Sequence, residues 1–260
     1  MRTWMLVPLA ALFATSAHAA GPEAGRFSMS LIGGADVPVN GDVHGGAVAA
    51  VPDLGPLNPA LAGIDAELRI GSRDHGRIYD RATTYGLEFA WGLDDSSEVF
   101  GQVLRTEAGK GRVMVGGAYV PALATELPVY GTFDAYKALS AEIGYRRYFG
   151  TPGSARPFVG ASIGGTRADE IRATFEIPDG GITIANAPFY KPGWSASGGV
   201  DVGVIMPVSD TFSFTLASGL RYSSDLKDDD SAIGGLGLAS INDTGSRLSV
   251  PVTLTARWDF

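Results

Sequence analysis

Two histidines are the residues of this chain whose side chains are best suited to acid–base chemistry. Beyond the first twenty residues, the only histidines are His44 and His75. Hydrolysis by a serine nucleophile would need an imidazole held between a serine and an acid. Both histidines lie in one long segment between strand-like stretches, and no serine stands at a convincing spacing within a strand. We therefore expect solvated imidazoles, no catalytic residue and no enzymatic activity.

An acidic run near the end of the chain could bind a divalent cation. The run "DLKDDDS" at 225–231 and the nearby Asp243 supply carboxylate oxygens, which hard cations prefer. The run lacks the glycine and the terminal glutamate of an EF-hand loop. We interpret it as a solvated acidic tip, and we predict no metal site and no cofactor.

A third set of charged residues stands inside segments of alternating hydrophobicity. Each lies on the polar side of its segment, opposite apolar neighbours. Facing one another in a narrow interior, such charges would pair, because unpaired buried charges are costly. The alternative is a gated pore or a proton path. The set comprises Glu88, Glu142, Arg146, Asp201, Arg221 and Arg257.

The elements that carry these charges are β-strands with one apolar face. The final stretch "SVPVTLTARWDF" shows the pattern best: from Leu248 to Phe260 every second residue is apolar, and the residues between them are small, polar or charged. Successive side chains of a strand point to opposite faces, so one face needs an apolar partner. The stretch "EVFGQVLRTE" at 98–107 has an ambiguous phase.

The connections between strands separate into short and long ones. Short breaks fall at 92–98, 150–155 and 206–210, and long breaks fall at about 37–80, 108–133, 167–193 and 223–245. They alternate strictly, which gives eight strands with both termini on the short-turn side. This arrangement is typical of a transmembrane barrel. The sequence therefore predicts an all-β fold, an eight-stranded antiparallel transmembrane β-barrel; a secreted soluble barrel or sandwich is the alternative.

The long breaks contain weaker alternation of their own. Residues 63–73, 111–120 and 173–185 read as strand extensions beyond the membrane. Residues 63–73 could instead form a ninth spanning strand, which would require a tenth. The role of residues 37–80 stays open.

Aromatic residues are expected near both ends of the strands, where a bilayer would have its interfaces. We predict a girdle at these positions, formed by Tyr85, Trp91, Tyr148, Trp194 and Tyr222.

The first twenty residues read as a secretory signal peptide, with a basic residue, an apolar run and a small-residue cleavage site ending in "SAHAA". We divide the chain into a signal peptide at 1–20 and a barrel domain at 21–260. The chain has no cysteine, and 28 acidic residues outnumber 20 basic ones. The negative charge disfavours nucleic acid as a partner.

Three motifs carry a resemblance to a known family: "EIGYRRYF" at 142–149, "RPFVGASIGG" at 156–165 and the terminal "VTLTARWDF". With them, residues 26–260 resemble the OmpA-like and opacity-protein-like small outer-membrane barrels. The resemblance implies that Trp258 and Phe260 act as an assembly signal for the barrel-assembly machinery. It also implies a place in the outer membrane of a Gram-negative bacterium, in contact with lipid and lipopolysaccharide.

The function expected from these features is structural or surface-interacting and non-enzymatic, with an extracellular ligand bound by the long loops. A narrow porin or a channel for small or hydrophobic solutes is the first alternative. A lipid-modifying outer-membrane enzyme is the second.

Overall fold

The computed structural model describes residues 20–260. The predicted signal peptide lies outside the described residues except for Ala20. None of the helices within residues 20–260 has the length and apolar character needed to cross a membrane.

Eight antiparallel strands close into a barrel, which confirms the predicted fold class. Around the barrel their order is β1-β17-β15-β14-β11-β10-β7-β6, and every neighbouring pair is antiparallel. Closure leaves no free edge, so every strand has a hydrogen-bonded neighbour on both sides. The strands are β1 (Phe27–Asn40), β6 (Ala82–Asp94), β7 (Ser97–Glu107), β10 (Lys137–Tyr148), β11 (Arg156–Ala168), β14 (Gly193–Pro207), β15 (Phe212–Ser223) and β17 (Arg247–Asp259).

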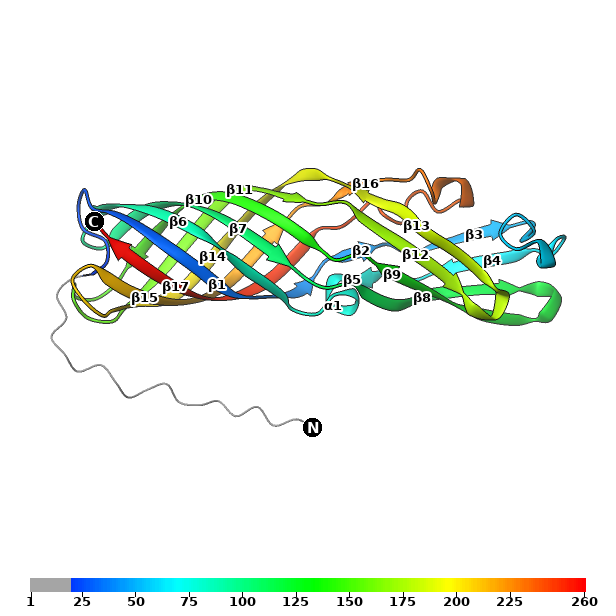
Figure 1. The fold of residues 1–260 in the computed structure, drawn as a ribbon, viewed down its shortest axis with the longest axis horizontal. Helices are drawn as coiled ribbons and strands as arrows, with labels where there is room; N and C mark the ends of the chain where they lie inside the picture. Colours follow the sequence, from blue (N-terminus) through cyan, green and yellow to red (C-terminus); the bar gives the residue numbers. More distant parts are fainter. Residues whose placement is uncertain (1–19) are drawn as a thin grey trace, which may run out of the picture.

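The connections sort by end of the barrel, as predicted. β6 to β7, β10 to β11 and β14 to β15 are joined by short turns at the end that holds the C-terminus (Figure 1). The four long connections leave from the opposite end. Residues 63–73 do not form a ninth strand of the barrel, because β4 pairs within a separate sheet.

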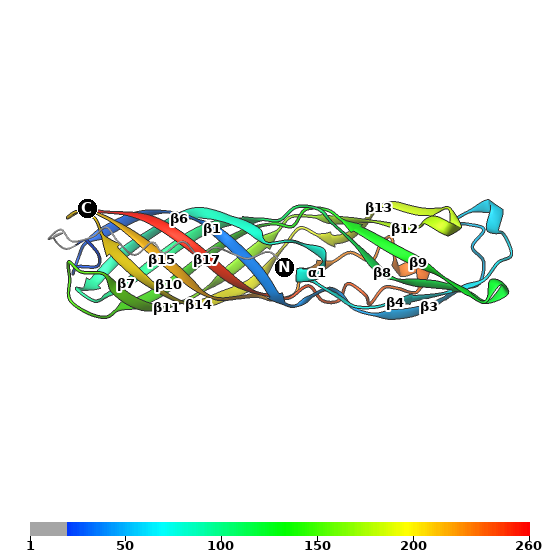
Figure 2. The same cartoon turned by 90° about the horizontal axis from the view of Figure 1, so that it is seen from below.

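The long connections fold into a second sheet that continues the barrel along its long axis (Figures 1 and 2). The predicted strand extensions are therefore confirmed, and they pair with one another in the order β16-β13-β12-β9-β8-β4-β3. The strands are β3 (Ala47–Val51), β4 (Ala66–Ile70), β8 (Gly111–Val120), β9 (Thr125–Phe133), β12 (Ile171–Ile177), β13 (Ile182–Lys191) and β16 (Lys227–Asp228).

Short elements complete this region, which we call the extension: the seven-stranded sheet with the loops between its strands, together with residues 41–46, 71–81 and 229–246. A two-stranded ladder and one helical turn join it to the barrel, and four 3-10 turns lie in its loops. These elements are β2 (Asp42–His44), β5 (Arg73–Asp74), α1 (His75–Ile78), η1 (Pro59–Leu61), η2 (Pro121–Leu123), η3 (Pro178–Gly180) and η4 (Gly234–Leu236).

The two faces of the barrel wall differ in composition. In β17, Leu254 and Trp258 are exposed on the outside, whereas Ser249 and Arg257 are buried inside. The structure also settles the phase of β7, which the sequence left ambiguous. The side chains of Glu98 and every second residue after it point inward, and those of Val99 and every second residue after it point outward.

Glycines make room for aromatic rings inside the barrel. A Cβ atom on Gly144 would lie 2.4 Å from the ring of Phe100, and one on Gly203 would lie 2.6 Å from the ring of Phe158. Both distances are shorter than van der Waals contact, so these positions accept only glycine while the rings keep their places.

Candidate functional site

The interior of the barrel contains a connected network of ion pairs with Glu98 at its centre. Glu98 Oε1 accepts hydrogen bonds from Arg146 Nη1 and from the Tyr148 hydroxyl, both at 2.7 Å, and Glu98 Oε2 accepts one from Arg257 Nη1 at 2.6 Å. Arg257 Nε also donates to Asp259 at 2.8 Å. All five side chains are buried. Each charge therefore has an opposite charge within hydrogen-bond distance, which offsets the cost of taking it out of water.

The predicted charges on neighbouring strands join this network or form a second one. Glu88 binds Arg146 through two hydrogen bonds, at 3.1 and 2.8 Å. Farther from the short turns, Glu142 lies 3.5 Å from Arg221 and accepts a hydrogen bond from Gln102 at 2.8 Å. The structure thus brings five of the six predicted residues into ion pairs.

The sixth, Asp201, lines the space between the two networks. This cavity has a volume of about 40 Å³ and is also lined by Glu88, Arg146, Arg221 and Arg257. It has room for only a few water molecules. At this level the lumen is filled by side chains, as the interior width of an eight-stranded barrel allows.

Glu98, Asp259 and Tyr148 belong to the network but were not predicted as part of it. The signal for Glu98 was its cross-strand position, because Glu98 of β7 stands directly opposite Arg146 of β10. Asp259 lies on the same face as Arg257, two residues away, and could have been found from the alternation of the last strand.

Tyr148 corrects the predicted aromatic girdle. Tyr85, Trp91, Trp194 and Tyr222 are exposed on the outer face, but Tyr148 is 2% exposed and points into the barrel. The reason is the two-residue period, which puts Tyr148 on the same face as Arg146.

A layer of buried aromatic side chains lies where the long connections join the barrel strands. Phe133, Tyr136, Phe189 and Tyr190 are each at most 3% exposed. At the start of barrel strand β17, the buried Arg247 donates a hydrogen bond to Asp36 at 2.6 Å. Its guanidinium lies 5.2 Å from the ring centre of Tyr136.

The two histidines are not solvated, contrary to the expectation from sequence. His44 and His75 are each 1% exposed, within the core of the extension. Burial lowers the pKa of both, that of His75 to about 3, because a charged imidazolium would lose its hydration. Within residues 20–260, His44 Nε2 has no hydrogen-bond partner, and the contacts of His75 include the backbone of Gly245 but no serine or acidic side chain. Neither therefore has the serine and acid contacts of a catalytic triad.

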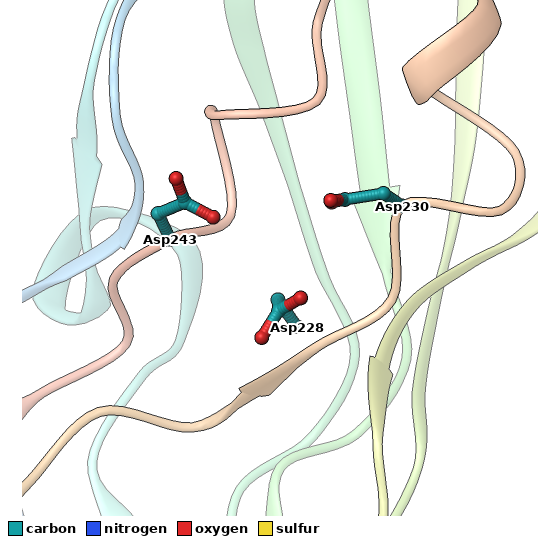
Figure 3. Close-up of side chains that lie close together, drawn as sticks. All are labelled: Asp228, Asp230 and Asp243. Atoms are coloured by element: carbon teal, nitrogen blue, oxygen red, sulfur yellow. The ribbon is translucent and has the colours of Figure 1, made fainter.

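The acidic residues of the last long connection form a compact group. Carboxylate oxygens of Asp228, Asp230 and Asp243 lie within 4.8 Å of one another, and Figure 3 shows the three side chains converging. Asp243 is exposed and the other two are partly exposed. Asp230 Oδ1, however, is buried and has no hydrogen-bond partner within residues 20–260, so the group is only in part the solvated acidic tip expected from sequence.

No protein-family model matches the chain, and no curated protein matches its sequence. Among solved structures, the N-terminal β-barrel domain of Pseudomonas aeruginosa OprF is 11% identical, with 91% of this chain and 98% of that chain covered and a TM-score of 0.38. Neisserial surface protein A is 14% identical, with coverages of 91% and 98% and a TM-score of 0.39. Outer membrane protein W of E. coli is 20% identical, with coverages of 92% and 99% and a TM-score of 0.36.

The chain folds into a closed barrel of eight antiparallel strands, the fold that the resemblance implies. The resemblance expected from sequence is thus confirmed for the fold. At these identities and TM-scores, the solved structures carry no argument about function, which has to come from the chain's own residues.

Proposed function

We propose that the protein is an integral outer-membrane protein whose barrel is a closed membrane anchor and whose extension acts outside the cell. The observation that carries this proposal is the buried ion-pair network around Glu98, which fills the lumen on the membrane side of the extension. The role is structural or surface-interacting and non-enzymatic.

The outer face of the barrel supports a membrane location. Aliphatic side chains are exposed around its middle, among them Ile143 at 68% and Ile163 at 70%. Exposed apolar patches of this extent are unusual on a soluble monomer. Lipid chains and lipopolysaccharide are the surroundings that would cover them. Trp91, near the turns, and Trp194, near the long connections, lie where the two interfaces are expected.

The C-terminal strand is suited to recognition during assembly. Phe260 is 73% exposed, and its ring lies 6.2 Å from that of Phe27 on the neighbouring strand β1. We propose the barrel-assembly machinery as the partner that binds Trp258 and Phe260 before β1 and β17 pair. The extension, with its own buried core, is the surface offered to an extracellular ligand.

A conductance measurement tests the closed lumen. The refolded protein, with its folded form verified by heat-modifiable migration on a gel, is inserted into a planar bilayer. We expect no steady conductance. Arg257→Ala removes the ion pairs of Arg257 with Glu98 and Asp259. Arg105→Ala, which removes two ion pairs outside the network, is the matched control. A reproducible conductance of the unchanged protein that responds to Arg257→Ala but not to Arg105→Ala would overturn the closed barrel in favour of a channel.

A binding assay tests the surface role. Cells that display the whole protein are compared with cells that display a form whose tips at η1 and η2 are replaced by short Gly-Ser turns. Adhesion to host or neighbouring cells should fall in the second case, while heat-modifiable protein stays at the same level. Equal adhesion would contradict the surface role.

A further inference from the structure

An apolar cavity lies within the extension, above the aromatic layer. Its volume is about 50 Å³. The lining side chains come from β2, β3, β4, β8, β9, β12 and β13, from the loop between β3 and β4 and from residues 233–241. They are all aliphatic or aromatic except His44. The cavity therefore has one polar group in otherwise hydrocarbon surroundings.

The protonation of His44 follows from its contact with the backbone. His44 Nδ1 lies 3.0 Å from the carbonyl oxygen of Gly45. A carbonyl oxygen only accepts hydrogen bonds, so Nδ1 carries the proton of the neutral ring and Nε2 has a free lone pair. Nε2 is buried and has no partner among the described residues. A buried acceptor without a donor is costly to leave unpaired.

Packing and burial hold His44 in this state. Its ring stacks on Phe133 with a centroid distance of 5.7 Å and meets Phe189 edge-on at 6.3 Å. Burial lowers the pKa of the imidazole, so the ring stays neutral at physiological pH. His44 is therefore the one polar residue that lines the cavity, and its Nε2 acceptor is unpaired among the described residues.

This arrangement selects among possible occupants. Water needs two to four polar partners in a buried site, and the cavity offers one. A carboxylate would place its oxygens against another acceptor. An alkane would fit the walls but leave Nε2 unpaired. A neutral hydroxyl on an alkyl chain would satisfy both the acceptor and the walls.

The wall that could admit such a chain is the segment 229–246. It lies between the sheet edges β16 and β3 and contributes Ile233, Leu236 and Ile241 to the lining. It contains no strand. Outside its own turns, its contacts include a hydrogen bond from the Gly45 amide to the Ile241 carbonyl at 2.6 Å and the Asn242 contact with Phe189. A segment held by few backbone hydrogen bonds opens more readily than a strand ladder.

The geometry points to a binding site for a neutral primary alcohol with an alkyl chain, whose hydroxyl donates to His44 Nε2 and whose chain displaces side chains of residues 233–241. Phe133 and Phe189 pack against His44, so we infer a binding pocket and not a passage to the lumen. This assignment goes beyond the anchoring and surface role proposed above.

The test uses isoleucine methyl NMR of the whole barrel in deuterated lipid nanodiscs. The probes are 1-hexanol, n-hexane and hexanoate at pH 8. Ile182 and Ile233 line the cavity, whereas Ile143 and Ile163 face lipid and report partition into the bilayer. We expect saturable shifts at Ile182 and Ile233 with 1-hexanol, weaker binding of n-hexane and no saturable shift with hexanoate.

Variants separate hydroxyl recognition from simple cavity filling. His44→Phe keeps a ring on Phe133 but removes the acceptor; we expect about tenfold weaker binding of 1-hexanol, the effect of losing one buried hydrogen bond, and unchanged or tighter binding of n-hexane. His75→Phe, a buried histidine that does not line the cavity, should bind 1-hexanol like the unchanged protein. Leu236→Trp, at a partly exposed position, should fill the cavity and abolish binding.

Three results would overturn the assignment. Shifts confined to Ile143 and Ile163 would mean that the alcohol only enters the bilayer. Equal saturation by n-hexane and 1-hexanol, with no effect of His44→Phe, would leave an apolar hole without hydroxyl recognition. If His44→Phe does not fold, unchanged 1-hexanol binding by a folded Leu236→Trp variant would place the ligand elsewhere.

Discussion

Neutralising Glu98 tests whether the lumen network stabilises the barrel. Glu98→Gln keeps the shape of the side chain but removes the charge that faces Arg146 and Arg257. Breaking a buried ion pair costs about 3–5 kcal/mol. Arg146 retains Glu88 at 2.8 Å and Arg257 retains Asp259 at 2.8 Å. We therefore expect a loss of about 3 kcal/mol in the free energy of unfolding, at the lower end of that range.

A graded series makes this expectation quantitative. Arg257→Met leaves both Glu98 and Asp259 without one of their partners, so its loss should approach about 5 kcal/mol. Glu107→Gln alters a pair with Arg105 in which the side chains are 39% and 25% exposed. Water screens that pair, and the loss should stay below about 1 kcal/mol.

The assay is urea unfolding of the protein in lipid vesicles, followed by tryptophan fluorescence, with heat-modifiable migration as a second probe of the folded form. The double variant Glu98→Gln/Arg257→Met should lose less than the sum of the single losses, because the two residues contact each other. Losses below about 1 kcal/mol for both Glu98→Gln and Arg257→Met, similar to that of Glu107→Gln, would refute the network as a source of stability.

Three further predictions concern packing, pH and assembly. Gly144→Ala should lower the yield of refolded protein, because the added Cβ atom would lie 2.4 Å from the Phe100 ring; refolding at the level of the unchanged protein would contradict the tight lumen. His75 binds a proton with a pKa of about 3 when folded and 6.5 as a free side chain, so the unfolded state takes up more protons between these values. The free energy of unfolding should therefore fall on acidification below pH 6.5, by up to about 1.4 kcal/mol per pH unit, and His75→Phe should reduce this slope in urea titrations at pH 7 to 4.5. Phe260→Ala should reduce heat-modifiable protein in cell envelopes but refold normally in vitro, whereas equal losses in both would indicate a purely structural role.

Strand alternation predicted the barrel because its two faces differ sharply in polarity. In β14 and β17 most apolar residues fall on one side, with Ile205 of β14 as an inward-facing exception, and a period of two is enough to assign the faces. The alternating short and long connections then fixed the number of strands. The same reasoning could not assign the two faces of β7, because Phe100 and Leu104 point inward while Val99 and Val103 point outward. When both faces are apolar, alternation gives no phase, and only the pairing with β10 assigns Glu98 to the lumen.

The site residues above the barrel could not be predicted in the same way. His44 and His75 lie in a segment with little periodicity, and their burial depends on strands far away in sequence, such as β9 and β13. The histidine–phenylalanine contacts join residues about ninety and one hundred and forty-five positions apart, and no local pattern encodes such contacts. The weak alternation of residues 63–73 predicted a strand extension, but not the closed apolar core that the extension forms with its neighbours.

The aromatic layer lies between a charged interior, the barrel lumen, and an apolar one, the core of the extension. Charges in the lumen keep their partners only if water and ligands do not enter from above, and the apolar core of the extension stays dry only if no charge reaches it from below. Phe133 and Phe189 form the floor of the upper core, and Tyr136 contacts the uppermost charged group, Arg247, from above. His44 lies on the extension side of this layer, and it is the one polar residue that lines the cavity. Its ring packs on Phe133 of the aromatic layer. Its Nε2, which has no partner among the described residues, is the atom that we propose binds a ligand of the extension.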